Sequence, residues 1–326
     1  MVNFDLLAPT AVKQGAFELI DNSKFCLFWT GDMPHVNSVY MELTLLAKRT
    51  NRIKLGIGCT NPYTRHPFVT ASAVSRVNQF AKGRMCLAFG AGTLEVLESI
   101  NMGWVEPVKR IKEAIEIIRG LLRGETLTYD GEIFKLKNVK LFDVELNWPV
   151  PIYVACRGPT MLKMAGANAD GVLMDDVPVE YVGYAINRIK KGCKEAGRSL
   201  KDFRFSNLVP FSVSKDRDEA RELVKRFIAI NLFTVPKQVL DLAKVSSEGI
   251  ERIKELWPDY EQCKKYITED IIDKFSISGT LDECLEHIDA FIKAGINEVS
   301  LALPRSVNLR ETIEVINKEI IPRFKD

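Results

Sequence analysis

Residues 52–74 read RIKLGIGCTNPYTRHPFVTASAV and contain an apolar strand, a polar loop and the beginning of a helix. The strand ends on Gly56 and Gly58, and the loop after it carries many polar and ring-bearing side chains. Loops are often polar only because water solvates them, so this stretch alone leaves two interpretations equally open, a binding site and an ordinary connection. Its order of strand, loop and helix is one βα unit of a parallel sheet.

The same alternation of strand and helix patterns runs along the whole chain, which is typical of βα units on a parallel sheet. Apolar residues recur at helical spacing in residues 107–123 and 281–294. We expect strands at residues 2–7, 25–29, 53–60, 85–90, 152–156, 171–174, 205–210 and 299–303. Eight strands of this kind favour a closed (β/α)8 TIM barrel. The chain has 326 residues, which suits one such domain over residues 1–326.

Two stretches, about residues 104–150 and 232–275, exceed the repeating unit and are interpreted as insertions. The first contains TLTYDGEIFKLKNVKLF, in which the pair Asp130-Gly131 predicts a two-residue hairpin turn. The second is helical and charged, and prolines interrupt it. Because loops at the carboxyl ends of the strands build the active face of such barrels, we expect both insertions on the C-terminal face.

Composition excludes several classes of protein. The net charge is only +2, from 45 basic and 43 acidic residues, and the basic clusters lie within helical patterns, which argues against nucleic-acid binding. The start, MVNFDLLAPT, lacks the pattern of a signal peptide, and no apolar run reaches membrane-spanning length. Seven scattered cysteines without a CxxC pair favour a reducing cytoplasm, and three distant histidines argue against a metal site.

Two strand ends lack side chains on one face. Residues two apart in a strand point to the same side, and both Gly56 with Gly58 and Gly90 with Gly92 have this spacing. We expect these gaps to leave a flat slot at the C-terminal mouth of the barrel, where a planar ring lies on backbone. The alternative is that the glycines only relieve crowding in a narrow barrel.

A second pattern, YVACRGPTMLKMAG at residues 153–166, predicts an anion site. A buried strand is followed by Arg157, Gly158, Pro159 and Thr160, which open a helix. The unpaired N–H groups of a helix start attract a phosphate, Gly158 permits close approach, and Arg157 adds a positive charge. The alternative is a capped helix with a surface arginine. The GAG at residues 90–92 lacks the longer dinucleotide fingerprint, so an NAD site is not expected.

Several segments together resemble the bacterial-luciferase-like superfamily. They are RIKLGIGCTNPYTRHPFVTASAV, AFGAG, RGPTMLKMAGANADGVL, FSISGTLDECLEHIDAFIKAGINEVSL and EIIPRFKD. The chain is most similar to the coenzyme F420-dependent branch of that superfamily, and within it to the methylenetetrahydromethanopterin reductases. The resemblance spans nearly the whole chain, and TNPYTRHP and DKFSISG are its most specific segments.

The resemblance implies a TIM barrel that holds a deazaflavin at its C-terminal mouth, with FMN as the alternative cofactor. The ring would lie against a bulge made by a non-proline cis peptide, which falls between Gly58 and Cys59 here. The remaining cofactor-binding residues carried over by the resemblance are Asp32, Thr60, Asn61, Gly90, Gly92, Arg157, Gly158, Pro159, Thr160 and Met161.

The implied reaction is hydride transfer from the reduced deazaflavin to the methylene carbon of a tetrahydropterin. We expect the protein to be cytoplasmic and to form a homo-oligomer of two or four copies. Asp5, taken to end the first strand, is the expected catalytic acid, and Thr93, which stands where the family usually has an acid, is the second candidate catalytic residue. Met33 and Val96 also depart from the family pattern. An FMN-dependent luciferase-like monooxygenase or reductase and a catalytically degenerate paralogue are therefore the alternatives.

Overall fold

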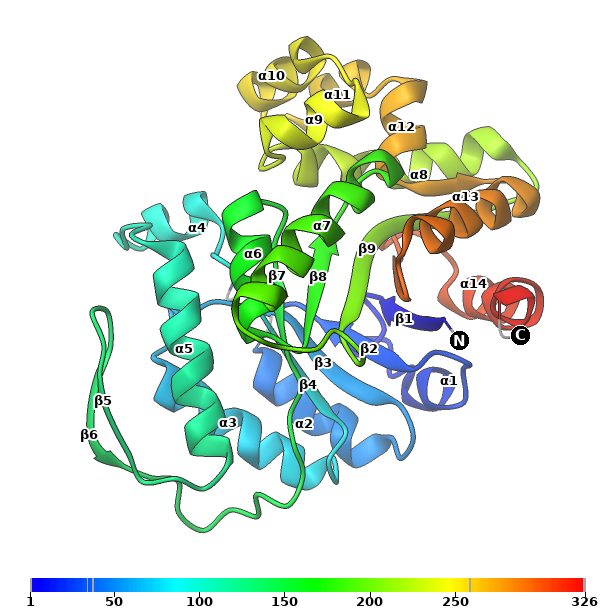
Figure 1. Cartoon of the computed structure of the whole chain (residues 1–326). Helices are drawn as coiled ribbons and strands as arrows, with labels where there is room; N and C mark the ends of the chain where they lie inside the picture. The colour runs from blue at the N-terminus through cyan, green and yellow to red at the C-terminus, as the bar shows by residue number, and fades with distance from the viewer. Residues whose placement is uncertain (1, 34, 37, 258, 325–326) are drawn as a thin grey trace.

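The computed structural model describes residues 2–33, 35–36, 38–257 and 259–324. Eight parallel strands form a closed barrel surrounded by helices (Figure 1). The barrel closes because β1 pairs with both β2 and β11, and β8 pairs with β9. In chain order the barrel strands are β1 (Asn3–Leu7), β2 (Leu27–Thr30), β3 (Lys54–Thr60), β4 (Met85–Phe89), β7 (Ile152–Ala155), β8 (Gly171–Asp175), β9 (Arg204–Val213) and β11 (Glu298–Ala302). Each coincides with a predicted strand, so the TIM barrel is confirmed.

Helices follow the strands and cover the outside of the barrel. They are α1 (Phe17–Asp21), α2 (Val39–Arg49), α3 (Pro67–Phe80), α4 (Leu94–Ser99), α5 (Pro107–Leu122), α6 (Pro159–Asn168), α7 (Val179–Glu195), α8 (Arg217–Leu232), α13 (Leu281–Ala294) and α14 (Leu309–Val315), with the last turns at Ile316–Ile320 and Ile321–Phe324. Three of them begin on a proline, whose fixed φ suits the first helical position. Helix α13 ends at Gly295, which has a positive φ of 113°.

Alternation along the strands divides the core into two parts. Phe4 and Leu6 point outward and pack with the helices, whereas Leu7 and Trp29 face the inside of the barrel. Burying these side chains removes apolar surface from water, which is the main favourable term in folding. The interior cluster extends along the strands, from Leu27 at the start of β2 to Ala302 at the end of β11, and its part nearest the carboxyl ends forms the base of the site described below.

The second insertion lies where it was predicted. It comprises α9 (Lys237–Ala243), α10 (Ser247–Leu256), α11 (Tyr260–Cys263), a short turn at Lys264–Tyr266 and α12 (Glu269–Phe275). These helices gather beyond the carboxyl ends of β8 and β9 (Figure 1). The chain then returns through β10 (Ile277–Gly279), which pairs with the end of β9.

The first insertion lies at the opposite end of the barrel from the one predicted. Its hairpin, β5 (Leu127–Asp130) and β6 (Lys135–Val139), follows α5 and therefore leaves from the N-terminal end, as Figure 1 shows. The Trp148 carbonyl accepts a hydrogen bond from Asn78 Nδ2 at 3.2 Å, close to the start of β4. The predicted two-residue turn is also wrong: Asp130 pairs with Lys135, so the loop is residues 131–134.

In the described part of the chain, no helix combines the length and the apolar character needed to cross a membrane. Among the same residues, no three His, Cys, Asp or Glu side chains stand close enough together to hold a metal ion.

Candidate active site

The carboxyl ends of the barrel strands surround a set of apolar side chains that we call the apolar floor: Leu7, Trp29, Leu173, Leu208 and Ala302. The Trp29 ring meets the Tyr153 ring edge-on, with centroids 5.6 Å apart. Phe227 of α8 packs against the same cluster. A flat, apolar base of this kind suits the face of a planar ring.

The side chain of Trp29 also explains why residues 56 and 58 are glycines. A Cβ on Gly56 would lie 2.5 Å from Trp29 Cζ3, and one on Gly58 would lie 2.8 Å from Trp29 Cε3. The expectation that these missing side chains leave an empty slot is therefore wrong, because the indole fills the space. The alternative interpretation, relief of crowding inside the barrel, describes this pair correctly.

The peptide bond between Gly58 and Cys59 is cis, as the resemblance implied. Cys59 directs its sulfur at the second pair of glycines, since a Cβ on Gly90 would lie 2.6 Å from Cys59 Sγ. Burial raises the pKa of the Cys59 thiol to about 12, and the nearby charges of Asp175 and Asp32 act in the same direction. This thiol is therefore neutral and unreactive at ordinary pH.

Asp32 and Thr60 hold the loop that follows the cis peptide. Thr60 Oγ1 donates to Asp32 Oδ2 at 2.7 Å, and Arg65 forms an ion pair with the same carboxylate. The Asp32 side chain is only 1% exposed, and Thr60 is equally buried. Asp32 Oδ1, in contrast, is buried without a hydrogen-bond partner among the described residues, so the predicted cofactor contacts through Asp32 and Thr60 stay predictions.

Asn61 shapes the next turn. Its Oδ1 accepts hydrogen bonds from the backbone N–H groups of Tyr63 at 3.0 Å and Thr64 at 2.9 Å. Tyr63 donates its hydroxyl to the Val105 carbonyl at 2.9 Å, and His66 Nδ1 accepts from a backbone N–H at the start of α3. Much of the polar character of this loop thus serves the loop itself, and the predicted contact between Asn61 and the cofactor stays a prediction.

The start of α6 has the properties expected of an anion site. Gly158 is its N-cap residue and supplies no side-chain cap, and a Cβ on Gly158 would meet no atom within 4 Å. Thr160 is exposed. Arg157 donates from Nη2 to Thr234 Oγ1 at 2.6 Å, whereas its Nη1 is buried without a hydrogen-bond partner among the described residues. Free N–H groups and an unsatisfied guanidinium nitrogen suit a phosphate.

Asp5 does not lie at the mouth. It occupies the middle of β1, is fully buried, and pairs in register with Ser300 one step below the level of Leu7 and Trp29. Ser300 Oγ donates to Asp5 Oδ2 at 3.2 Å and accepts from Trp29 Nε1 at the same distance. Burial, and then the neighbouring Glu298, raise the pKa of Asp5. The predicted position at a strand end is wrong, and the apolar floor separates Asp5 from the mouth.

Thr93, which departs from the acid usual in the family, lies near the surface. Thr93 is exposed at the N-cap position of α4, where its side chain makes no capping hydrogen bond. Gly92 just before it has a positive φ of 76°, and a Cβ there would lie 3.1 Å from Leu97 Cδ1. A catalytic role for Thr93 and cofactor contacts through Gly90 and Gly92 stay predictions.

Sequence reasoning missed two residues of this region. Trp29 is the third residue of the strand LFWT, and Asp175 ends another strand, GVLMD. A charged residue at the carboxyl end of a barrel strand was the signal that could have identified Asp175.

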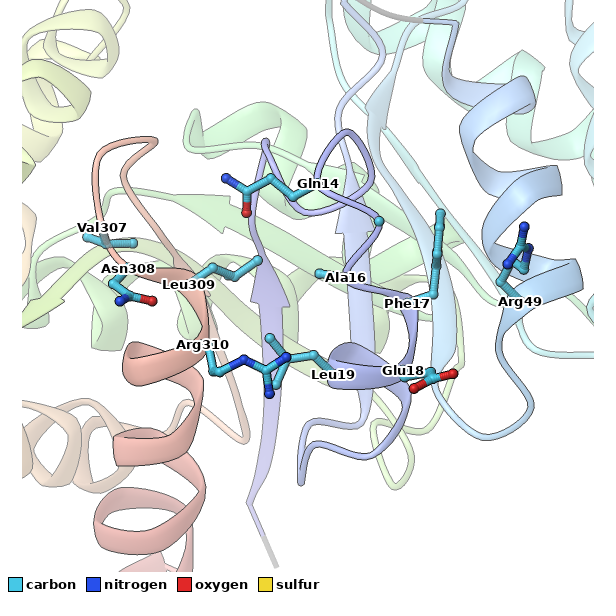
Figure 2. Close-up of a pocket in the computed structure, with 11 residues that line it drawn as sticks. Gln14, Ala16, Phe17, Glu18, Leu19, Arg49, Val307, Asn308, Leu309 and Arg310 are labelled. Atoms are coloured by element: carbon cyan, nitrogen blue, oxygen red, sulfur yellow. The ribbon is translucent and has the colours of Figure 1, made fainter.

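A separate cavity of about 500 Å³ lies outside the barrel, between the beginnings of α1 and α14 (Figure 2). Its lining residues are Gln14, Gly15, Ala16, Phe17, Glu18, Leu19, Arg49, Val307, Asn308, Leu309 and Arg310. Arg49 stands over the Phe17 ring, 5.8 Å from its centroid. The cavity shares no residue with the apolar floor or with the start of α6, and we assign it no part in the reaction.

A family model described as luciferase-like monooxygenase matches residues 14–298. The chain belongs to this luciferase-like family, which confirms the resemblance inferred from the sequence. It is 37% identical over 314 residues to the 5,10-methylenetetrahydromethanopterin reductase of Archaeoglobus fulgidus, and the match covers 94% of each chain. The enzyme of the same name from Methanolobus tindarius is 33% identical, over 93% of this chain and 94% of its own.

A solved structure agrees with these sequence matches. The coenzyme F420-dependent tetrahydromethanopterin reductase from Methanopyrus kandleri matches with a TM-score of 0.91 and 31% identity, over 99% of both chains. The likeness therefore includes the barrel, the insertions and the C-terminal end of the chain.

Proposed function

We propose that this protein is an oxidoreductase that uses coenzyme F420 and transfers a hydride to 5,10-methylenetetrahydromethanopterin. The observation that carries the proposal is the likeness to reductases of that name over nearly the full length of both chains. At 31% to 37% identity this likeness is well above what a shared barrel alone requires, since one fold hosts many activities.

The residues at the mouth fit such a coenzyme, which would supply the hydride. The apolar floor and the backbone at Gly58 and Cys59 offer a flat surface for a ring. The start of α6, which follows Gly158 and begins with Pro159, offers the backbone N–H groups of Thr160 and Met161 to an anionic tail. Arg157 adds a positive charge with one buried, unsatisfied nitrogen. These groups would orient the ring and hold the tail.

The chain itself would also restrict access of water. Thr234, just after α8, accepts a hydrogen bond from Arg157, and Asn231 Nδ2 donates to Asp176 Oδ2. These two contacts tie the end of α8 to the loops after β7 and β8. Phe227 of the same helix packs on the apolar floor. An apolar, partly covered site strengthens the electrostatic interactions inside it.

Separate titrations of the purified protein with coenzyme F420 and with FMN test the choice of cofactor. We expect saturable binding of coenzyme F420 and much weaker binding of FMN. Tight binding of FMN alone would favour the monooxygenase or FMN reductase alternative. Binding of neither cofactor would favour a degenerate paralogue.

Two further expectations from the sequence, a cytoplasmic location and a homo-oligomer of two or four copies, stay proposals. Light scattering on the purified protein measures the mass in solution. A mass equal to the 36.8 kDa chain would contradict the oligomer.

A further inference from the structure

Asp175 stands at the edge of the apolar floor. It is the last residue of β8, and it follows Leu173 by two positions, so both side chains face the inside of the barrel. Leu173 lies at the level of the cis peptide, because a Cβ on Gly58 would be 3.2 Å from Leu173 Cδ2. The next inward position on the same strand, that of Asp175, is therefore at the mouth, above the floor.

The surroundings of Asp175 leave its carboxyl group available. The group is half-buried, and no hydrogen bond to it is found among the described residues. The next residue, Asp176, is different: it is 2% exposed, and Asn231 holds its carboxylate. One of two adjacent acids is thus fixed in the wall of the site, and the other faces the space above the floor.

The charged and titratable groups that act on Asp175 come from three elements. Arg157 lies on the loop after β7, Asp176 directly follows Asp175 at the end of β8, and the neutral thiol of Cys59 lies on β3. Burial raises the pKa of Asp175, and the positive charge of Arg157 acts in the opposite direction. A carboxyl group in this setting can carry a proton at a higher pH than an ordinary surface aspartate.

We propose that Asp175 is the catalytic acid that donates a proton to the pterin nitrogen released during the reaction, an inference that rests on the proposed function. In the substrate, the methylene carbon bridges two nitrogen atoms. One carbon–nitrogen bond breaks, a hydride from the reduced coenzyme forms a carbon–hydrogen bond at that carbon, and the nitrogen takes the proton of Asp175. The coenzyme is oxidised by two electrons, the substrate carbon is reduced, and solvent returns a proton to the carboxylate.

The expected effects follow from this role. The acid acts only when it is protonated, so the rate of hydride transfer should fall as the pH rises through the pKa of Asp175. The variant Asp175→Asn has no proton to donate and should lose that pH dependence together with about a hundredfold or more in rate. Asp175→Glu keeps an acid at the same position and should restore part of the rate.

The experiment compares wild type, Asp175→Asn, Asp175→Glu and a charge-matched control, Asp202→Asn. Asp202 is an exposed acid before β9, at the opposite end of the barrel. Single-turnover mixing of the reduced coenzyme–protein complex with methylenetetrahydromethanopterin measures the rate, and titration with coenzyme measures its Kd. Carboxyl carbon NMR of the protein without coenzyme follows the titration of Asp175, as the signal that Asp175→Asn lacks.

The expected result is a large loss of rate in Asp175→Asn only, with a nearly unchanged Kd and a carboxyl signal that titrates above its ordinary range. A wild-type rate in Asp175→Asn, a parallel loss of coenzyme binding, or an ordinary titration would overturn the role of Asp175. Those outcomes leave the proposed function intact, because wild type still transfers hydride. Absence of transfer in wild type would overturn the proposed function itself, and this inference with it.

Discussion

At the scale of single residues, Trp29 organises the inside of the barrel. Its indole occupies the space beside Gly56 and Gly58, and its N–H donates to Ser300 Oγ at 3.2 Å. The ring thereby covers Asp5 and keeps the polar interior apart from the mouth. The glycines of β3 are explained by this one side chain, since any larger residue there would overlap it.

Replacing Gly56 by alanine should destabilise the fold by about 1–3 kcal/mol, the usual cost of overpacking a core. The matched control is Gly183→Ala in α7, where a new Cβ would meet no atom within 4 Å. That substitution should be neutral or stabilising, because alanine favours a helix more than glycine does. Denaturant unfolding measures both. Equal stability of Gly56→Ala and wild type would contradict the assigned role of Trp29.

Arg157→Ala tests the anion site. It removes a charge-assisted hydrogen bond to the coenzyme tail, worth about 1.5–3 kcal/mol, so affinity should fall about tenfold to a hundredfold. Thr234→Val is the control: the guanidinium stays but loses its 2.6 Å hydrogen bond, so binding should weaken far less. Coenzyme titrations at low and moderate salt measure both variants. Unchanged affinity of Arg157→Ala at both salt concentrations would place the tail elsewhere.

At the scale of elements, helix α13 has the most complete N-terminus. Thr280 Oγ1 accepts from the Glu283 N–H, and the Glu283 carboxylate accepts in return from the Thr280 N–H at 2.8 Å. Thr280→Ala should lower the free energy of unfolding by about 1 kcal/mol, whereas Thr280→Ser should keep most of it. Thermal or denaturant unfolding compares the two. If Thr280→Ser and Thr280→Ala lower the free energy of unfolding equally, the capping box does not stabilise α13.

The barrel strands were predictable from the sequence because each is a short apolar run followed by a helical pattern. The position of the β5–β6 hairpin was not predictable from its turn residues, because the same residues can form a turn at either end of the barrel. The position of Asp5 below the mouth of the barrel was also not predictable. The sequence of a short strand does not show whether an acidic residue lies in its middle or at its end. The glycine pairs and the start of α6 were found, but the occupant of the space beside the glycines, Trp29, comes from another strand.

At the scale of the whole molecule, buried acids make stability depend on pH. Oδ1 of Asp5 has no hydrogen-bond donor among the described residues, and Glu298 lies beside it. Tyr153 donates its hydroxyl to Glu298 Oε2 at 3.0 Å. Burial, and then Glu298, raise the pKa of Asp5 above its ordinary value of 3.8, so the folded protein keeps a proton that the unfolded chain releases.

This contribution is fully present below the ordinary pKa of aspartate and is lost as the pH rises through the raised one. The free energy of unfolding of wild type should therefore fall with pH, by up to about 1.4 kcal/mol per pH unit for one proton. Asp5→Asn cannot release a proton and should have a flatter profile, with hydride transfer nearly unchanged. Denaturant unfolding over a pH series measures this effect. Identical slopes would contradict a protonated Asp5.

We propose that this barrel transfers a hydride at its mouth, from reduced coenzyme F420 to methylenetetrahydromethanopterin. The most direct measurement is a single turnover: the protein loaded with reduced coenzyme is mixed with that substrate, and the absorbance of the oxidised coenzyme is followed. We predict one oxidised coenzyme and one methylated pterin per site, and no reaction when reduced FMN replaces coenzyme F420. Coenzyme that binds but stays reduced in the presence of the substrate would contradict the account.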